Sequence, residues 1–214
     1  MSLNKFLREA QDMLSKYDEK RLEVETLSRK IIRLTKKAIF LTHQEKFEET
    51  EITLKEIGKL LLNLKEAIQE YPQFASNGFV NTAFQEFAEA SLYYNLVKQK
   101  EFIDPKEIDV SPSQYLLGLA DCIGELRRRV LDLIRSGRIK EAEETLEIMD
   151  KILYELNLNS DLQVLVSGLR RKCDIARAII EATRGDVTLE ARRISLEKSI
   201  KRLIDLASEK EKQG

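Results

Sequence analysis

The chain has few residues of the kinds that interrupt helices. Its 214 residues include 3 prolines and 8 glycines, while 43% are hydrophobic, and Leu, Glu, Lys, Ile and Arg are abundant. Proline and glycine are the weakest helix formers, whereas the abundant residues are among the better ones. We therefore expect an all-α protein without a β-sheet.

Cysteine and histidine are also scarce. Cys122 and Cys173 lie in helical patterns without the spacing of a zinc site, so we expect reduced core thiols and an intracellular protein. His43 is the only histidine, which excludes a ribonuclease that uses a histidine acid-base pair. It also excludes a di-iron bundle, which would need paired Glu-x-x-His motifs.

Neither charge sign is in large excess, and no long apolar run is present. Lys and Arg number 36 against 37 Asp and Glu, for a formal net charge of -1, which excludes a uniformly basic nucleic-acid coat but not local patches. The amphipathic N-terminus lacks an apolar signal region, and nothing reaches the length of a membrane span. We expect a cytoplasmic protein without membrane contact.

Hydrophobic periodicity predicts seven helices with short connections, and no linker or internal repeat divides them. We expect a single domain over residues 1–214, folded as a seven-helix up-and-down bundle. Ser111 and Pro112 are typical of a helix start, and Gly137 and Gly185 of helix ends. The predicted helices cover residues 2–43, 46–70, 77–100, 111–136, 139–158, 161–184 and 188–210.

Two stretches are nearly free of charge in a chain that is 34% charged. Residues 110–126 contain only Asp121 and Glu125, and residues 71–97 contain only Glu86 and Glu89, where the composition would give about nine charges. Within each pair the acids lie about one helical turn apart, so they share a face.

Both stretches are apolar on more than one side, so we expect these two helices to be buried and to pack together. Four carboxylates would then meet without a local cation, which repulsion and desolvation oppose unless they are protonated or share a metal ion. The sequence therefore predicts a metal site formed by Glu86, Glu89, Asp121 and Glu125.

Three segments resemble the translin family. TLSRKIIRLTKKAIFLTH at residues 26–43 is similar to its LSR-I-x-K-x-IF-x-x-H pattern, and YLLGLADCIGEL at residues 115–126 to its YLLG-x-AD-x-x-GEL signature. FQEFAEA at residues 84–90 resembles the branch of translin-associated factor X, whose catalytic acids lie in a QExxE segment and in the ADxxGEL segment. The likeness covers most of the chain. It implies catalytic roles for Glu86, Glu89, Asp121 and Glu125.

The resemblance implies a translin-type helical fold, a barrel-like homo-octamer, and Mg²⁺-dependent endonuclease action on single-stranded RNA inside the shell, with single-stranded DNA open as a substrate. The N-terminus lacks the long basic extension of the eukaryotic catalytic subunit. We therefore expect an archaeal-type homologue that forms a homo-oligomer.

The four acids suit Mg²⁺, a hard cation that prefers oxygen ligands, and Mn²⁺ can substitute. A metal-bound water would attack the scissile phosphate, and the cation would neutralise charge in the transition state. We assign Asp121 and Glu125 as direct ligands, Glu86 as a ligand or bridging group, and Glu89 as a ligand or the base that orients the water.

Nucleic-acid binding would rest on local patches near the family segments. For every one of these residues the alternative is a solvated helix face or an ion pair with a nearby Glu, and for His43 it is a helix cap or surface position. We favour the arginines that follow Glu125, because they adjoin the predicted metal site. The candidates are Arg33, Lys36, Lys37, His43, Arg127, Arg128 and Arg129.

Two other functions remain open from the sequence. One is a translin-like shell that binds single-stranded nucleic acid without cutting it, against which the presence of all four acids argues. The other is an all-α nucleoside triphosphate pyrophosphohydrolase, which also combines an ExxE segment with a second acidic helix around Mg²⁺. Here the second segment is DxxxE and not ExxD.

Overall fold

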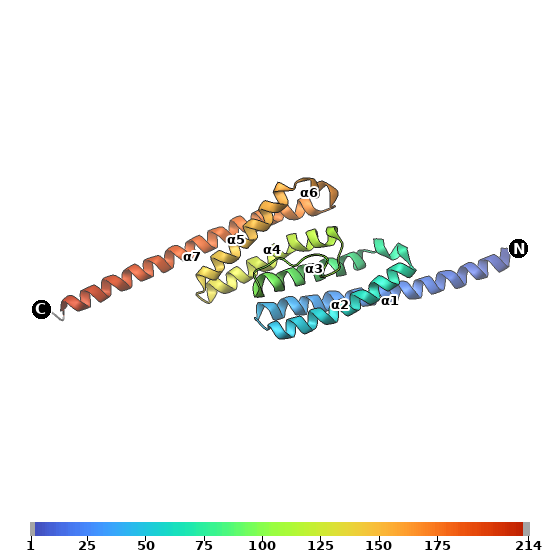
Figure 1. Cartoon of the computed structure of the whole chain (residues 1–214), viewed down its shortest axis with the longest axis horizontal. Helices are drawn as coiled ribbons and strands as arrows, with labels where there is room; N and C mark the ends of the chain where they lie inside the picture. The colour runs from blue at the N-terminus through green and yellow to red at the C-terminus, as the bar shows by residue number, and fades with distance from the viewer. Residues whose placement is uncertain (1–2, 212–214) are drawn as a thin grey trace. The chain divides into compact units, whose positions relative to one another are not determined.

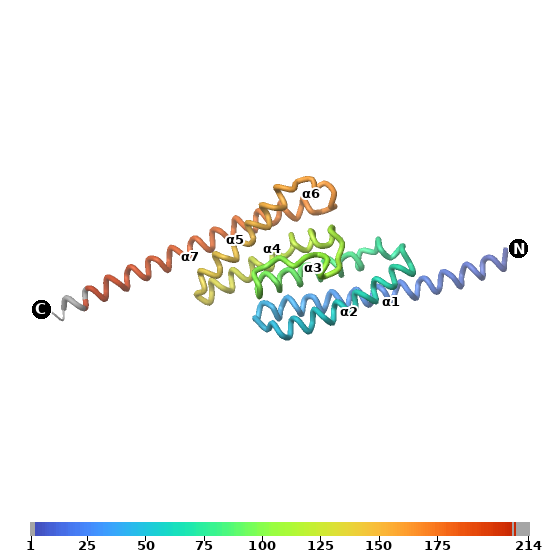
Figure 2. Tube along the Cα trace, viewed as in Figure 1, coloured from blue at the N-terminus to red at the C-terminus, as the bar shows by residue number. Residues whose placement is uncertain are grey.

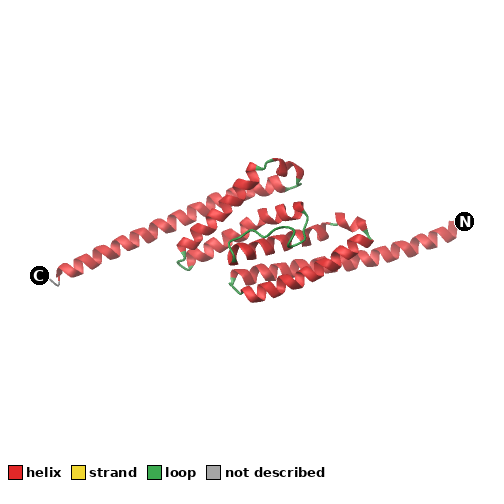
Figure 3. Ribbon diagram, viewed as in Figure 1, coloured by secondary structure: helices red, strands yellow, loops and turns green. Residues whose placement is uncertain are grey.

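The computed structural model describes residues 3–211 of the chain, and within this range it contains helices and no β-strand (Figure 3). This confirms the all-α prediction. No described helix has the length and apolar character needed to cross a bilayer. The helices are α1 (Leu3–His43), α2 (Phe47–Glu70), the 3-10 helix η1 (Pro72–Ser76), α3 (Gly78–Lys98), α4 (Pro112–Arg135), α5 (Ile139–Leu158), α6 (Asp161–Leu165) and α7 (Leu169–Glu211).

The chain divides into two compact units, the first ending at Cys122 and the second beginning at Ile123. The first unit contains α1, α2, η1, α3 and the N-terminal half of α4; the second contains the rest of α4 with α5, α6 and α7. The expectation of a single domain over residues 1–214 remains a prediction.

In the first unit, α1 and α2 form an antiparallel pair against which α3 packs (Figure 1). The connection of residues 44–46 is too short for any other arrangement of two adjacent helices. Pro72 follows the last residues of α2 and opens η1, because proline lacks the N–H that a continuing helix would need. The fully buried side chains of this unit include Ile31, Ile57, Leu64, Phe74, Leu92 and Tyr93.

Helix α3 is buried on almost every side, as its apolar sequence predicts. Phe84, Phe87 and Tyr93, which lie on different faces, are all less than 9% exposed. Asn77 starts the helix, because its side-chain oxygen accepts a hydrogen bond from the backbone N–H of Phe79 at 2.9 Å. The acids of α3 are therefore held in a helix that has little freedom to turn.

Both ends of α4 agree with the predicted signals. Ser111 Oγ accepts a hydrogen bond from the backbone N–H of Gln114, and Gln114 Oε1 accepts one from the backbone N–H of Ser111, forming a capping box. After the last helical residue, Gly137 adopts a positive φ of 74°, and the backbone N–H of Arg138 bonds to the carbonyl of Leu133.

The connection of residues 99–111 runs back along α3, so α3 and the first half of α4 point in the same direction (Figure 2). Two contacts anchor it: Tyr115 donates to the carbonyl of Ile103 at 2.7 Å, and Lys65 forms an ion pair with Asp109. Successive helices otherwise run in opposite directions in the first unit, but α3 and α4 run in the same direction. The start of α4 therefore lies beside the start of α3.

In the second unit, α5 and α7 pack against each other, and Arg184 of α7 pairs with Asp150 of α5 at 2.8 Å. The sequence predicted two helices over residues 161–184 and 188–210, divided at Gly185, and this division is wrong. The break occurs at Gly168, which has a φ of 85°, and α7 then continues through Gly185. A single glycine costs a helix only about 1 kcal/mol, and the good helix formers around it offset that cost.

Helices α3 and α4 approach each other closely at Gly118. A Cβ atom at this position would lie 2.8 Å from the backbone nitrogen of Glu89, 2.9 Å from the backbone oxygen of Gln85 and 3.0 Å from the Cβ of Ala88. Backbone atoms of a buried helix cannot move aside as a flexible side chain can. The absence of a side chain at Gly118 is therefore what lets the two helices touch.

We predict that Gly118→Ala lowers the free energy of unfolding. Overpacking against the α3 backbone costs about 1–3 kcal/mol, which exceeds the roughly 1 kcal/mol that alanine gains over glycine in a helix. Urea unfolding followed by circular dichroism measures the change.

Gly124→Ala on the same helix is the matched control, because a Cβ at Gly124 would meet no atom within 4 Å. It should raise the free energy of unfolding by up to about 1 kcal/mol. Equal stability gains in the two variants would show that the helices do not approach at Gly118.

Candidate functional site

Asp121 of α4 faces α3. Its Oδ2 accepts a hydrogen bond of 2.6 Å from Nε2 of Gln85, and both side chains are half-buried. Gly118 lies one turn earlier on α4 and touches the same region of α3. The predicted packing of the two charge-poor helices is therefore present at Asp121.

The two acids of α3 come directly after this contact along the helix. Glu86 follows Gln85 directly, and the backbone nitrogen of Glu89 is the atom that a Cβ on Gly118 would approach most closely. Glu86 and Glu89 are half-buried. Their neighbours along the helix, Phe84, Phe87 and Ala90, are buried. The sequence prediction that these acids belong to a largely apolar helix is correct.

Glu125 follows Asp121 by one turn of α4 and is half-buried. The spacing places both carboxylates on the same side of the helix. Between them, Cys122 and Ile123 are fully buried, so the acid-bearing side of α4 adjoins its buried side.

The donor set fits a hard divalent cation, because all four side chains are carboxylates and oxygen is the ligand that Mg²⁺ prefers. Within residues 3–211, however, no three His, Cys, Asp or Glu side chains are grouped closely enough to hold a metal ion. Asp121 instead uses one carboxylate oxygen to accept from Gln85. The metal-ligand roles of Glu86, Glu89, Asp121 and Glu125 remain predictions.

His43 ends α1 and contacts α3. Its Nδ1 lies 2.9 Å from the hydroxyl oxygen of Tyr93, and the ring centroids are 4.8 Å apart. Tyr93 is fully buried and lies one turn after Glu89 on α3. His43 therefore ties the end of α1 to the acid-bearing helix, and the prediction that it contacts nucleic acid stays open.

Tyr115, the first residue of the YLLG segment, is held in a partly buried position. Burial raises the pKa of its phenol above the ordinary value, and the nearby carboxylate of Asp104 raises it further. The neutral hydroxyl donates a hydrogen bond to the carbonyl of Ile103. This residue therefore fixes the returning connection.

Three of the basic residues predicted to bind nucleic acid lie exposed on α1. Arg33, Lys36 and Lys37 are all exposed, and none has an ion-pair partner among the residues that the structure describes. Their charges are therefore not neutralised by the protein's own acids.

The arginines after Glu125 differ from one another. Arg127 donates to Oγ1 of Thr183 at 2.8 Å and pairs with Asp186 at 3.2 Å, both on α7. Arg129 is only 9% exposed, whereas Arg128 is exposed. Arg127 thus joins two helices of the second unit, and Arg128 is the member of the group best placed to meet a ligand from solvent.

The sequence prediction did not include Gln85 or Tyr93. Gln85 is part of the QExxE segment, but a glutamine beside two acids gives no sign that its amide will reach a third acid on another helix. Tyr93 lies in the apolar stretch of residues 71–97, which gives no sign of its contact with His43. A pairing between residues far apart in sequence leaves no local pattern that would have revealed it.

Comparison with known proteins identifies the family of the chain. Residues 19–183 match the family model described as Translin family. An uncharacterized protein of Methanocaldococcus jannaschii is 35% identical over 192 residues, which cover 89% of this chain and 85% of that protein.

Solved structures with similar folds include AfC3PO, with 35% identity and a TM-score of 0.74, covering 87% of this chain and 97% of that one. A complex of AfC3PO with duplex RNA is similar at 34% identity and a TM-score of 0.73, with the same coverage. The structure of apo-NeC3PO, at 24% identity and a TM-score of 0.79, covers 89% and 98% of the two chains and shares the fold. With a family match that spans the acids of both helices, the chain belongs to the translin family.

Proposed function

We propose that this chain is a Mg²⁺-dependent endoribonuclease that cleaves single-stranded RNA, with single-stranded DNA as a further candidate substrate. The observation that carries the proposal is the contact of Asp121 with α3 at Gln85. It puts an acid of the charge-poor stretch of residues 110–126 against the part of α3 that contains Glu86 and Glu89. Half-buried carboxylates on two contacting helices are more typical of a functional site than of a packing core.

Glu86, Glu89, Asp121 and Glu125 would hold the ion. Bound Mg²⁺ supplies an activated water and charge neutralisation at the scissile phosphate. In this proposal Asp121 and Glu125 act as ligands, Glu86 as a ligand or bridge, and Glu89 as a ligand or as the base that orients the water. The buried faces of α3 and α4 fix the helices from which the acid side chains extend.

The relatives support nucleic acid as the partner. AfC3PO, whose chain in a complex with duplex RNA is 34% identical to this one, binds RNA. Here the phosphate contacts would come from the exposed residues Arg33, Lys36, Lys37 and Arg128. Within the family, the QExxE segment at residues 85–89 favours a catalytic subunit of the translin-associated factor X type.

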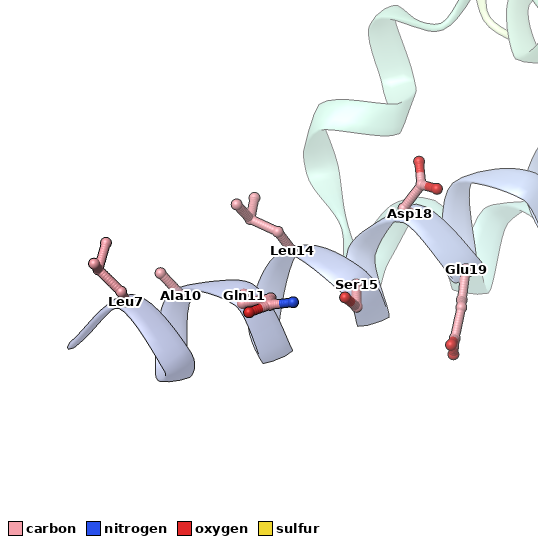
Figure 4. A pocket seen from close by; sticks show the side chains of 7 residues that line it. All are labelled: Leu7, Ala10, Gln11, Leu14, Ser15, Asp18 and Glu19. Carbon is pink, nitrogen blue, oxygen red and sulfur yellow. The ribbon is translucent and has the colours of Figure 1, made fainter. Parts of the chain in front are cut away.

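Self-association into a homo-octamer is part of the proposal, because both terminal helices present apolar residues to solvent. On α1, Leu7, Ala10 and Leu14 point to one side of the helix and line a shallow hollow (Figure 4). Leu7 is 52% exposed and Leu14 is 66% exposed. Similar exposed residues recur on α7 at Leu189, Leu196, Ile200 and Leu203. Stripes of this kind mark surfaces that a partner covers.

A non-catalytic shell is the second candidate, and one observation favours it. The described acids include no group of three that could hold a metal ion, and Asp121 already has Gln85 as a hydrogen-bond partner. A shell of this kind would bind single-stranded RNA equally well with and without Mg²⁺ and would leave it intact.

The first prediction from this proposal is that Asp121→Asn and Glu125→Gln each abolish cleavage of a single-stranded RNA in Mg²⁺ or Mn²⁺. Each change removes a negative ligand with almost no change in shape, so native mass and RNA affinity should stay close to wild type. Excess EDTA should stop cleavage by the wild-type protein. A gel assay with end-labelled RNA measures the products.

Glu143→Gln is the matched control, since Glu143 is an exposed acid of α5 outside the site. It should cut RNA at the wild-type rate. Full activity of Glu125→Gln, or of wild-type protein in EDTA, would contradict the nuclease proposal, and the same RNA left uncut by wild type would favour the shell.

The second prediction is that the wild-type protein has a native mass of about 200 kDa, as eight chains of 24.8 kDa would give. Leu196→Glu with Ile200→Glu should reduce that mass, because two charges replace apolar residues of the α7 stripe. Lys201→Glu, an exposed neighbouring residue, should leave the mass unchanged. A wild-type mass of one chain would exclude the assembly.

A further inference from the structure

One segment of α1 carries positive charge and no negative charge. Between Glu25 and Glu45 the chain contains five cations, Arg29, Lys30, Arg33, Lys36 and Lys37, and no Asp or Glu. This is unusual in a chain with a net charge of -1. The acid-free segment, residues 26–44, therefore creates a local positive field on an otherwise nearly neutral molecule.

The preceding turns of α1 are different. Arg21 pairs with Asp18 at 2.7 Å and also with Glu25, and Lys20 pairs with Glu23 at 3.0 Å. Within the acid-free segment, Lys30 is 4.0 Å from Glu56 of α2, while Arg33, Lys36 and Lys37 have no ion pair in the described part of the chain.

These cations share a helix face with an exposed phenylalanine. At about 100° per residue, Arg29, Arg33, Lys36 and Phe40 fall within roughly 60° of one another around the helix axis. All four are exposed, whereas the opposite side of the helix is buried, with Ile31 and Ala38 at 0% exposure. The basic-aromatic stripe, as we define these four residues, faces away from the core of the first unit.

Phe40 is 50% exposed, and no aromatic ring or cation contacts it within residues 3–211. At the other end of the stripe, Arg29 already stacks on an aromatic ring of α3. The guanidinium of Arg29 lies 4.6 Å from the centroid of the ring of Phe79, which is itself 39% exposed. The ring of Phe40 offers a comparable surface that the protein leaves uncovered.

We infer that the basic-aromatic stripe binds single-stranded RNA, with Phe40 as a platform on which one base stacks and Arg33 and Lys36 as phosphate contacts. The inference rests on the proposed function and adds Phe40 as a residue that contacts a base of the substrate. Positive charge that follows a backbone, combined with an aromatic surface for bases, is how proteins bind single strands without reading their sequence. In a duplex the faces of the bases are covered by their neighbours, so Phe40 would select unpaired RNA.

Phosphate contacts and stacking respond differently to salt, which separates the two roles. Contacts to phosphate release counterions, so each lost contact reduces the slope of log affinity against log salt by about 0.7 for a single strand. Stacking releases no counterions. A change at Phe40 should therefore weaken binding by the same factor at every salt concentration.

The test is fluorescence anisotropy with a 12-nucleotide oligo(U), without divalent ions, from 50 to 300 mM KCl. Phe40→Leu keeps an apolar side chain but removes the aromatic surface, and it should weaken binding about tenfold with an unchanged salt slope. Phe40→Tyr should bind like wild type. Arg33→Ala with Lys36→Ala should reduce the salt slope by about 1.4.

Phe6→Leu is the matched control, because Phe6 is 55% exposed on the same helix but lies outside the acid-free segment. It should bind oligo(U) like wild type. The affinity for a 12-base-pair RNA duplex should be the same for Phe40→Leu and wild type.

Wild-type affinity of Phe40→Leu for oligo(U) would overturn the inference. So would a reduced native mass of Phe40→Leu, which would show that a second copy of the chain covers Phe40. Wild-type protein that binds oligo(U) but never cuts RNA would remove the nuclease proposal and leave this inference intact, whereas wild-type protein that binds no RNA would remove both.

Discussion

The direct contact between α3 and α4 at Gly118 is the constraint on which the rest of the site depends. A side chain there would meet the backbone of Gln85 and Glu89 at less than 3 Å, so only glycine allows this approach. One turn later the same approach lets the amide of Gln85 reach the carboxylate of Asp121. The contact of Asp121 with the segment of α3 that carries Glu86 and Glu89 therefore depends on a residue without a side chain.

The sequence predicted much of this arrangement because burial and charge leave strong local patterns. The stretches around Glu86 and Asp121 are nearly free of charge, and both belong to helices with extensive buried sides. The start of α4 at Pro112 and its end before Gly137 were also predictable, since capping depends on the side chain and backbone of only a few residues. The acid-bearing helices could be identified without any knowledge of their partners.

Other features depend on contacts between distant residues, and the sequence could not reveal them. Arg127 and Arg128 are adjacent arginines that the sequence does not distinguish. In the structure Arg127 contacts Thr183 and Asp186, whereas Arg128 is exposed. Gly185 looks like a helix end, yet α7 continues through it, and the break falls at Gly168, where the backbone adopts a positive φ. The sequence does not reveal which of the two glycines ends a helix, because the intrinsic cost of glycine is small.

The central claim is that the acids of α3 and α4 together bind a divalent ion. Anomalous diffraction from crystals of the wild-type protein soaked in Mn²⁺ tests it most directly, since manganese can be located by its own scattering. The account predicts a manganese peak in contact with Asp121 and with Glu86 or Glu89, and no such peak in Asp121→Asn crystals. A wild-type map with Asp121 still bonded to Gln85 and manganese bound only elsewhere would contradict it.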